Sequence, residues 1–254
     1  MRDTPIRIPD NASPAATGMD GHLTAMPRQL SRNELLAIHD AAAVAIECIG
    51  ALAKKGRNPV TEVLAGANTV EEWARFPTGG VIDRGTHCQF YYHAHATHER
   101  AANEHGHFHT FVRAKRPARE PPSIVAASDA AWISHLVGIS TDASGQVNRL
   151  FTTNRWVTDE VWHAADALIG MLDQFDMTVS RPSRDLNRWI TAIIRMFRPQ
   201  IVELIRARDL RVTRWRAIHP DEDVLEDRDL QVTSEIAVDF LTKIRAIDAA
   251  MDRA

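Results

Sequence analysis

Apolar residues recur at helical spacing near the start of the chain. Over residues 34–55, leucine, isoleucine and alanine return every three or four positions, which is the period of an amphipathic helix. Ser31 and Glu34 have the spacing of a capping box that starts such a helix. Thr69 and Glu72 repeat this spacing and predict a short second helix that ends before Pro77. Residues 1–29 show no period, so we expect a disordered tail there.

From Gly79 to Val157 the period falls to two residues, which indicates β-strands. Between residues 87 and 95, polar side chains alternate with apolar ones, so that one face of the strand is polar and the other is apolar. Cys88 falls on the apolar face, and we expect it in the core. Residues 105–112 alternate in the same way, and residues 142–145 form a turn sequence between two further strands. The pattern predicts an antiparallel sheet of about four strands.

Helical periodicity returns after this sheet. It predicts helices at roughly 159–175, 184–198, 199–208 and 232–251, with Thr158 as the N-cap of the first and Pro199 between the middle two. The fold class is therefore α+β, with a central antiparallel sheet of about four strands flanked by N-terminal and C-terminal helices. We expect a single domain over residues 30–254, helical at 31–77, sheet at 79–157 and helical again at 158–252.

Seven of the 12 histidines lie between His87 and His109. Side chains two apart on a strand point to the same face, and opposite residues on neighbouring strands lie about 4.5–5.5 Å apart at Cβ. His93 and His95 on one strand, with His107 and His109 on the next, could therefore share one ion. Imidazoles without a thiolate suit Fe, Zn, Mn, Ni or Cu. The spacing predicts a mononuclear site for a divalent transition metal.

Residues near these histidines are candidates for catalysis and substrate binding. Glu99 and Glu104 lie in the connection between the two strands, where a carboxylate can serve as a ligand or a general base. His135, on a third strand, could be a further ligand or a proton shuttle. Three residues on or at the end of the predicted strands are candidates for binding a substrate: Tyr91, Asn154 and Arg155.

The leading hypothesis is a metal-dependent enzyme, an oxidoreductase or a hydrolase, that acts on a small molecule. Three protein ligands and an open position favour catalysis, whereas a closed shell of four ligands favours a non-enzymatic metal-binding or sensing protein. The remaining alternative is a polar network of histidines with a structural role only.

Part of the histidine segment resembles the first motif of the cupin superfamily. His93-Ala94-His95 is followed at the motif's spacings by Glu99 and Gly106. This resemblance covers about fifteen residues and implies a ligand geometry rather than the whole fold. A second cupin motif is missing from the sequence, and the long helices do not suit a pure β-barrel.

A second stretch is similar to the histidine triad motif of nucleotide hydrolases and transferases. It runs from His105 through His107 to His109 with single residues between them. The similarity implies that His107 attacks an α-phosphate without help from a metal. Gly106 and Thr110 depart from the apolar positions of that motif, and the similarity gives no role to the two upstream histidines.

The run YYHAHxxxER…EHGHFHxFVR, together with LFTTNRWVTDE, resembles an uncharacterised bacterial family known only as a domain of unknown function. That resemblance covers most of the chain and implies no activity.

Composition limits the partners. A net charge of −3 and a hydrophobic content of 44% are ordinary for a soluble protein, so we expect neither a nucleic acid nor a membrane as partner. We find no apolar stretch near the length of about 20 residues that a membrane helix needs, and no secretory signal. Cys48 and Cys88 are too few for a disulfide framework, so a cytoplasmic location is expected. A small-molecule substrate and a homo-oligomer are compatible with the sequence.

Overall fold

A computed structural model describes residues 30–67, 74–96, 98, 100–101, 103–113 and 133–253. Three expectations from the sequence therefore lie outside the described residues. They are the disordered tail at 1–29, the capping box at Thr69 and Glu72, and the position of Glu99.

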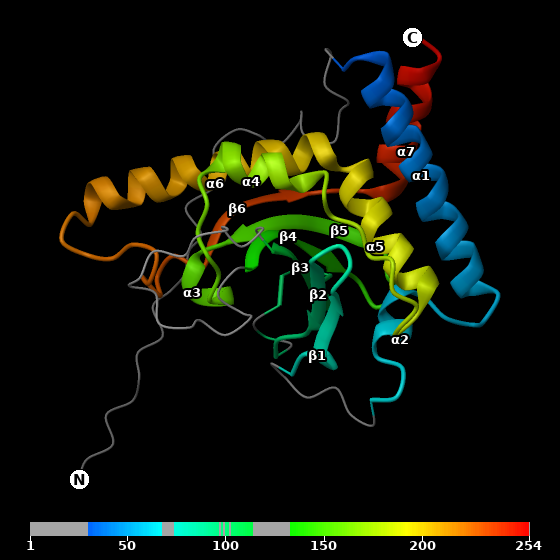
Figure 1. Cartoon of the computed structure of the whole chain (residues 1–254), viewed down its shortest axis with the longest axis horizontal. Helices are drawn as coiled ribbons and strands as arrows, with labels where there is room; N and C mark the ends of the chain where they lie inside the picture. Colours follow the sequence, from blue (N-terminus) through cyan, green and yellow to red (C-terminus); the bar gives the residue numbers. More distant parts are fainter. Residues whose placement is uncertain are drawn as a thin grey trace.

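An antiparallel sheet of six strands lies at the centre of the fold, with its strands in sequence order (Figure 1). The predicted antiparallel sheet is confirmed, with two strands more than expected. The strands are β1 (Phe76–Asp83), β2 (Cys88–His93), β3 (Gly106–Arg113), β4 (Ile133–Thr141), β5 (Val147–Thr153) and β6 (Val232–Ala237).

Helices flank this sheet in the sequence, as predicted. Figure 1 shows α4, α5 and α6 along one side of the sheet, while α1 packs against α5 and α7. The described residues form seven helices: α1 (Arg32–Ala53), α2 (Pro59–Val63), α3 (Arg155–Thr158), α4 (Ala165–Leu172), α5 (Arg184–Met196), α6 (Arg198–Ile218) and α7 (Phe240–Met251).

Helix α1 starts as its sequence predicts. The Ser31 hydroxyl accepts a hydrogen bond from the Glu34 backbone at 3.3 Å, and the Glu34 carboxylate accepts one from the Ser31 backbone at 2.8 Å. The helix is also long and apolar enough to cross a membrane, judged by length and composition alone. The expectation that no apolar stretch reaches the length of a membrane helix was therefore wrong for residues 32–53. In the structure, the buried face of α1 packs in the protein core against α5.

The helix predicted at 159–175 is wrong at its start. Asn154 caps the short helix α3 by accepting a hydrogen bond from the Arg155 backbone at 3.0 Å. Thr158 is therefore the last residue of a helix rather than an N-cap, and Asp159 ends that helix in the left-handed conformation, at φ 54°. Only residues 165–172 of the predicted span form the next helix, α4.

The helix predicted at 232–251 is wrong in its first part, where residues 232–237 form β6. This segment pairs with β5, and the Thr152 hydroxyl contacts the hydroxyls of Thr233 and Ser234 at 2.8 and 2.6 Å. A sheet edge that needs a partner has overridden the local helical pattern, as β-branched residues allow. The predicted break at Pro199 is confirmed, although α6 extends ten residues beyond its expected end, to Ile218.

The two faces of the sheet have different roles. Phe90, Tyr92 and Phe108 lie fully buried on the face that packs against the helices, where the rings of Phe108 and Trp189 of α5 lie 5.6 Å apart. Cys88 is also fully buried on this face, as alternation predicted. The opposite face carries the alternate residues of the same strands, and these include the histidines.

Asp83, at the end of β1, joins the sheet to the segment before α5. Its buried carboxylate accepts hydrogen bonds from the Thr178 backbone at 2.6 Å and from the Thr178 hydroxyl at 2.7 Å. The backbone amides of Val179, Gly85 and Thr86 donate to it as well. Burial alone would raise the pKa of this carboxyl, but the donors together hold it below its ordinary value.

We therefore expect Asp83→Asn to lower the free energy of unfolding by about 2–3 kcal/mol at neutral pH, because an amide cannot satisfy all of these donors. Since the folded state lowers the pKa of Asp83, this difference is present near neutral pH, begins to decrease near pH 4 and is lost as the pH falls through the lowered pKa of the folded state. Urea unfolding at pH 7 and at pH 3.5 measures it. The exposed Asp40→Asn serves as control, and an Asp83→Asn midpoint equal to that of the wild type would contradict this role.

Candidate metal centre

The pairing of β2 with β3 brings the histidines together. His93 lies directly opposite His107, and Tyr91 lies opposite His109. The ring centroids of His93 are 4.3 Å from His107 and 5.1 Å from His109, and His107 is 4.8 Å from His109. All three side chains are buried. The even spacing along each strand thus produces one compact group of imidazoles.

Glu104 orients the ring of His107. One carboxylate oxygen accepts a hydrogen bond from His107 Nδ1 at 2.7 Å, and the other accepts from Ser140 Oγ at 2.8 Å and Arg149 Nη2 at 2.7 Å. Burial would raise the pKa of Glu104, but the hydrogen bond from His107 and the nearby positive charges lower it to about 2. An ionised carboxylate can only accept, so the proton lies on Nδ1 and Nε2 of His107 is left for a metal.

A β-bulge brings His135 to the same face. Strict alternation from Gly138 and Ser140 would direct His135 into the helix-facing core. The register between β3 and β4 shifts at this point, because Thr110 pairs with Val137 while Phe111 pairs with His135. The extra residue turns His135 toward the histidine group.

His135 orients His109 as Glu104 orients His107. Its Nε2 lies 3.0 Å from Nδ1 of His109, and its Nδ1 lies 3.3 Å from the Thr153 hydroxyl. Its backbone amide donates to Glu160 at 2.6 Å. Burial, assisted by the charge of Arg208, lowers the pKa of His135 to about 3, so this ring stays neutral. With Nδ1 of His109 engaged in this contact, Nε2 is its nitrogen left for a metal.

Gly138 makes room for a ring beside the histidines. A Cβ at this position would lie 2.3 Å from the ring of Phe151, far inside van der Waals contact. The Phe151 ring instead crosses the glycine and contacts His107 edge-on, with centroids 5.0 Å apart. Phe151 therefore forms an apolar wall of the site.

His93, His107 and His109 could hold a metal ion. Their ligand nitrogens all lie within 4.8 Å of one another. Bonds of about 2.0–2.1 Å in a tetrahedral site require separations of about 3.4 Å, a contraction that side-chain rotations can supply. Burial, followed by the neighbouring histidines, lowers the pKa of His93 to about 2 and holds that of His109 well below its ordinary value. Neutral imidazoles carry the free lone pair that a metal needs.

His95, the fourth predicted ligand, lies just beyond the end of β2. Its Nε2 is 3.0 Å from Nε2 of His93, and its ring centroid is 5.2 Å from that of His107. It is half-buried, whereas His93 and His107 are buried. Its position is therefore at the opening of the group rather than within it.

A cavity of about 830 Å³ lies over the histidines. This volume lies in the range of pockets that bind small molecules. Its lining comes from the sheet and the residue before β1, from the connection between β2 and β3, from α3, from α6 and from the segment before β6. Among the lining residues are Arg75, Tyr91, His93, His95, Glu104, His107, His109, Arg149, Phe151, Trp156, Arg228 and Glu235.

The structure distributes the predicted substrate residues differently. Tyr91 lines the cavity, and its ring stacks on His93 and lies tilted against His109. Asn154 is fully buried and donates to the carbonyl of Val224 at 2.8 Å, while Arg155 forms ion pairs with Asp223 and Glu226. Neither residue is part of the cavity lining, and both connect α3 to the segment at 223–226.

The structure also separates the three histidines of the triad-like stretch. His105 precedes β3, and its Nδ1 lies 2.7 Å from the hydroxyl of Tyr92, a residue of the helix-facing side. His107 and His109 belong to the opposite face. The arrangement that the histidine triad resemblance requires is therefore not formed.

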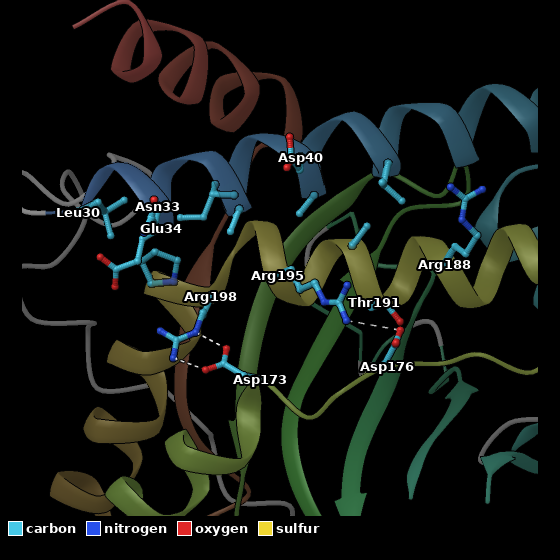
Figure 2. Close-up of a pocket in the computed structure, with 16 residues that line it drawn as sticks. Leu30, Asn33, Glu34, Asp40, Asp173, Asp176, Arg188, Thr191, Arg195 and Arg198 are labelled. Atoms are coloured by element: carbon cyan, nitrogen blue, oxygen red, sulfur yellow. Dashed lines mark hydrogen bonds and ion pairs between the residues drawn. The ribbon is translucent and has the colours of Figure 1, made fainter. Parts of the chain in front are cut away.

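A second hollow lies between α1 and α5 and contains no histidine (Figure 2). Its charged side chains already have partners, since Arg198 binds Asp173 at 2.6 Å and Arg195 lies 3.6 Å from Asp176. A second group that could hold an ion, formed by His219, Glu222 and Asp227, is partly exposed after α6. The buried histidine group with its cavity remains the strongest candidate for a functional site.

Several residues of this cavity were not predicted from the sequence. Arg149 and Phe151 of β5 were not considered, although they alternate with Leu150 and so share a face with Thr153. That alternation was the available signal. Arg75 and Trp156 were missed as well, and no motif in the sequence marks them.

The fold and the site define a protein with an antiparallel sheet that carries a buried histidine group capable of holding a metal. A family model described as Domain of unknown function (DUF6969) matches residues 39–238. The chain belongs to this family, which confirms the resemblance to a family of unknown function. No curated protein and no solved structure matches the chain. The comparisons do not show a relationship to the cupins.

We expect Glu104→Gln to weaken metal binding by about 10–100-fold, because the amide holds His107 less firmly and leaves Arg149 without its buried partner. Titration with a competing chelator measures this affinity. The control is Glu235→Gln, since Glu235 binds the other side of the same guanidinium at 2.7 Å but is half-exposed. Equal metal affinity in the wild type and both variants would contradict the role of Glu104.

Proposed function

We propose that this protein is a metal-dependent enzyme that acts on a small molecule. Its divalent transition metal would be held by Nε2 of His107 and of His109 together with His93. Two features together support this proposal. Three buried imidazoles have their ligand nitrogens within 4.8 Å of one another, and the same residues line a cavity of about 830 Å³.

Open coordination supports catalysis over sensing or storage. Three protein ligands leave one position of a tetrahedral site free, and that position would face the cavity. A closed shell of four ligands would require His95 to turn inward. As placed, His95 is half-buried and lines the cavity. The arrangement therefore favours an enzyme, and a non-enzymatic metal-binding protein is the alternative.

A metal held in this way would supply Lewis acidity and would lower the pKa of a bound water. The chain's own residues would do the remaining work. Glu104 and His135 lie behind the ligand rings and would keep them oriented, so we assign them positioning roles rather than catalytic ones. Tyr91 and Phe151 would exclude water from the cavity walls.

His95 is suited to move a proton. It lines the cavity, and its Nε2 lies 3.0 Å from that of His93, so a group bound beside the ligands would lie within its reach. Glu99, the other base that the sequence suggests near this edge, keeps its predicted role as ligand or base. Neither role selects between hydrolysis and oxidation.

Elemental analysis of the protein without a polyhistidine tag tests the proposal. We expect about one equivalent of a transition metal per chain in the wild type, and loss of that metal in a His93→Ala/His107→Ala double variant. His39→Ala, which removes an exposed imidazole on α1, is the matched control and should keep the metal. Circular dichroism verifies that each variant is folded.

A wild-type protein without metal after incubation with Fe(II), Zn, Mn, Ni and Cu would contradict the proposal. So would equal metal content in the double variant and the control.

A further inference from the structure

Each of three aromatic side chains in the cavity carries an arginine on its ring face. The guanidinium carbon of Arg75 lies 4.6 Å from the ring centroid of Tyr91. Arg149 lies 4.6 Å from Phe151, and Arg228 lies 4.5 Å from Trp156. All six residues line the same cavity: Arg75, Tyr91, Arg149, Phe151, Trp156 and Arg228. A repeated pairing of this kind points to a ligand with matching chemistry.

One of these arginines is already committed to protein partners. Arg149 donates to Glu104, Glu235 and Ser140, so all of its nitrogens are engaged. Arg75 and Arg228 differ from it. Within residues 74–96, 103–113 and 133–253, neither guanidinium has an acidic group at ion-pair distance, and both side chains are exposed toward solvent. Toward the described part of the chain, their donors have no acidic partner and can serve a ligand.

Stacking prepares these two arginines for binding. An aromatic ring below the guanidinium plane restricts the rotation of the side chain, while the N–H donors in that plane remain free. The planar fork of donors fits the two oxygens of a carboxylate or a phosphate. Less side-chain entropy is then lost when the ligand binds.

The electrostatics of the whole cavity favour an anion. Its lining contains five arginines and three acidic residues, and two of the acidic residues, Glu104 and Glu235, are bound to Arg149. Tyr91 lies between Arg75 and the histidines. The guanidinium of Arg75 covers one face of the Tyr91 ring, and the ring centroids of Tyr91 and His109 lie 5.1 Å apart. A divalent metal on neutral imidazoles would add further positive charge at the floor.

We propose that the cavity binds a small organic anion that carries a carboxylate or a phosphate group. The stacked guanidiniums of Arg75 and Arg228 are the cationic groups that the cavity offers to this ligand, while the apolar part of the ligand contacts Phe151 and Trp156. The proposal rests on the proposed function only in assigning this ligand as the substrate of the metal site. Anion binding by the two arginines is measurable on its own.

Calorimetric titration of the protein, as purified and after loading with Zn²⁺, tests this proposal with three probes that share a phenyl ring. Benzoate carries a carboxylate, phenyl phosphate carries a phosphate, and benzamide is neutral. We expect at least one anion to bind more tightly than benzamide, and the tighter of the two identifies the charged group. In an Arg75→Gln/Arg228→Gln double variant, anion affinity should fall by about tenfold or more.

The control variant is Arg206→Gln, which removes an exposed arginine of α6 outside the cavity lining and should bind the anions as the wild type does. Thermal unfolding verifies that both variants are folded. Absence of binding by both anions would overturn the proposal, as would equal anion affinity in the double variant and the wild type. A protein that binds anions but takes up no metal would support this proposal and refute the proposed function. A protein that takes up metal but binds neither anion would overturn this proposal and leave the proposed function standing.

Discussion

The pairing of His93 with His107 across β2 and β3 is the constraint on which the site depends. Each strand presents alternate residues to two different environments, helices on one face and the cavity on the other. A slip of one residue would place Phe108 in the cavity and His107 in the apolar core. The packing of Phe108 against Trp189 therefore also holds the histidines in their position on the opposite face. Stability of the core and geometry of the site come from the same register.

Burial of this many imidazoles has an electrostatic cost, and the surrounding residues limit it. The rings of His93 and His109 remain neutral because a charge on either would be desolvated and close to the neighbouring histidines, which lowers the pKa of both. Glu104, the buried carboxylate that contacts a ligand ring, has both oxygens occupied by His107, Ser140 and Arg149. Polar groups that are buried and satisfied in this way are rigid, which is what a metal centre requires of its ligands.

Much of this arrangement could be predicted from the sequence, because side-chain alternation is a local property. Even spacing within residues 87–95 and 105–112 was enough to predict the shared face of His93, His107 and His109, the core position of Cys88 and the antiparallel sheet, although it placed His105 on the wrong face. The capping box at Ser31 was equally local. The bulge that turns His135 toward His109 could not be foreseen, because it depends on the register between two strands distant in sequence.

The same reason accounts for the other errors. Strand β6 and the short helix α3 depend on tertiary contacts, namely the edge of β5 and the contacts of Asn154 and Arg155 with the segment at 223–226. The three arginines that stack on aromatic rings come from the residue before β1, from β5 and from the segment before β6, so no spacing along the chain groups them. The histidines could be predicted from the sequence. The residues that orient their rings and those that line the rest of the cavity became apparent only from the fold.

X-ray absorption spectroscopy of the metal-loaded protein identifies the atoms that bind the metal and so tests whether three histidines hold it. The proposed site has three imidazole nitrogens at about 2.0–2.1 Å from a zinc ion, together with one oxygen atom from solvent. Spectra with sulfur neighbours, or with oxygen neighbours and no imidazole scattering, would contradict it.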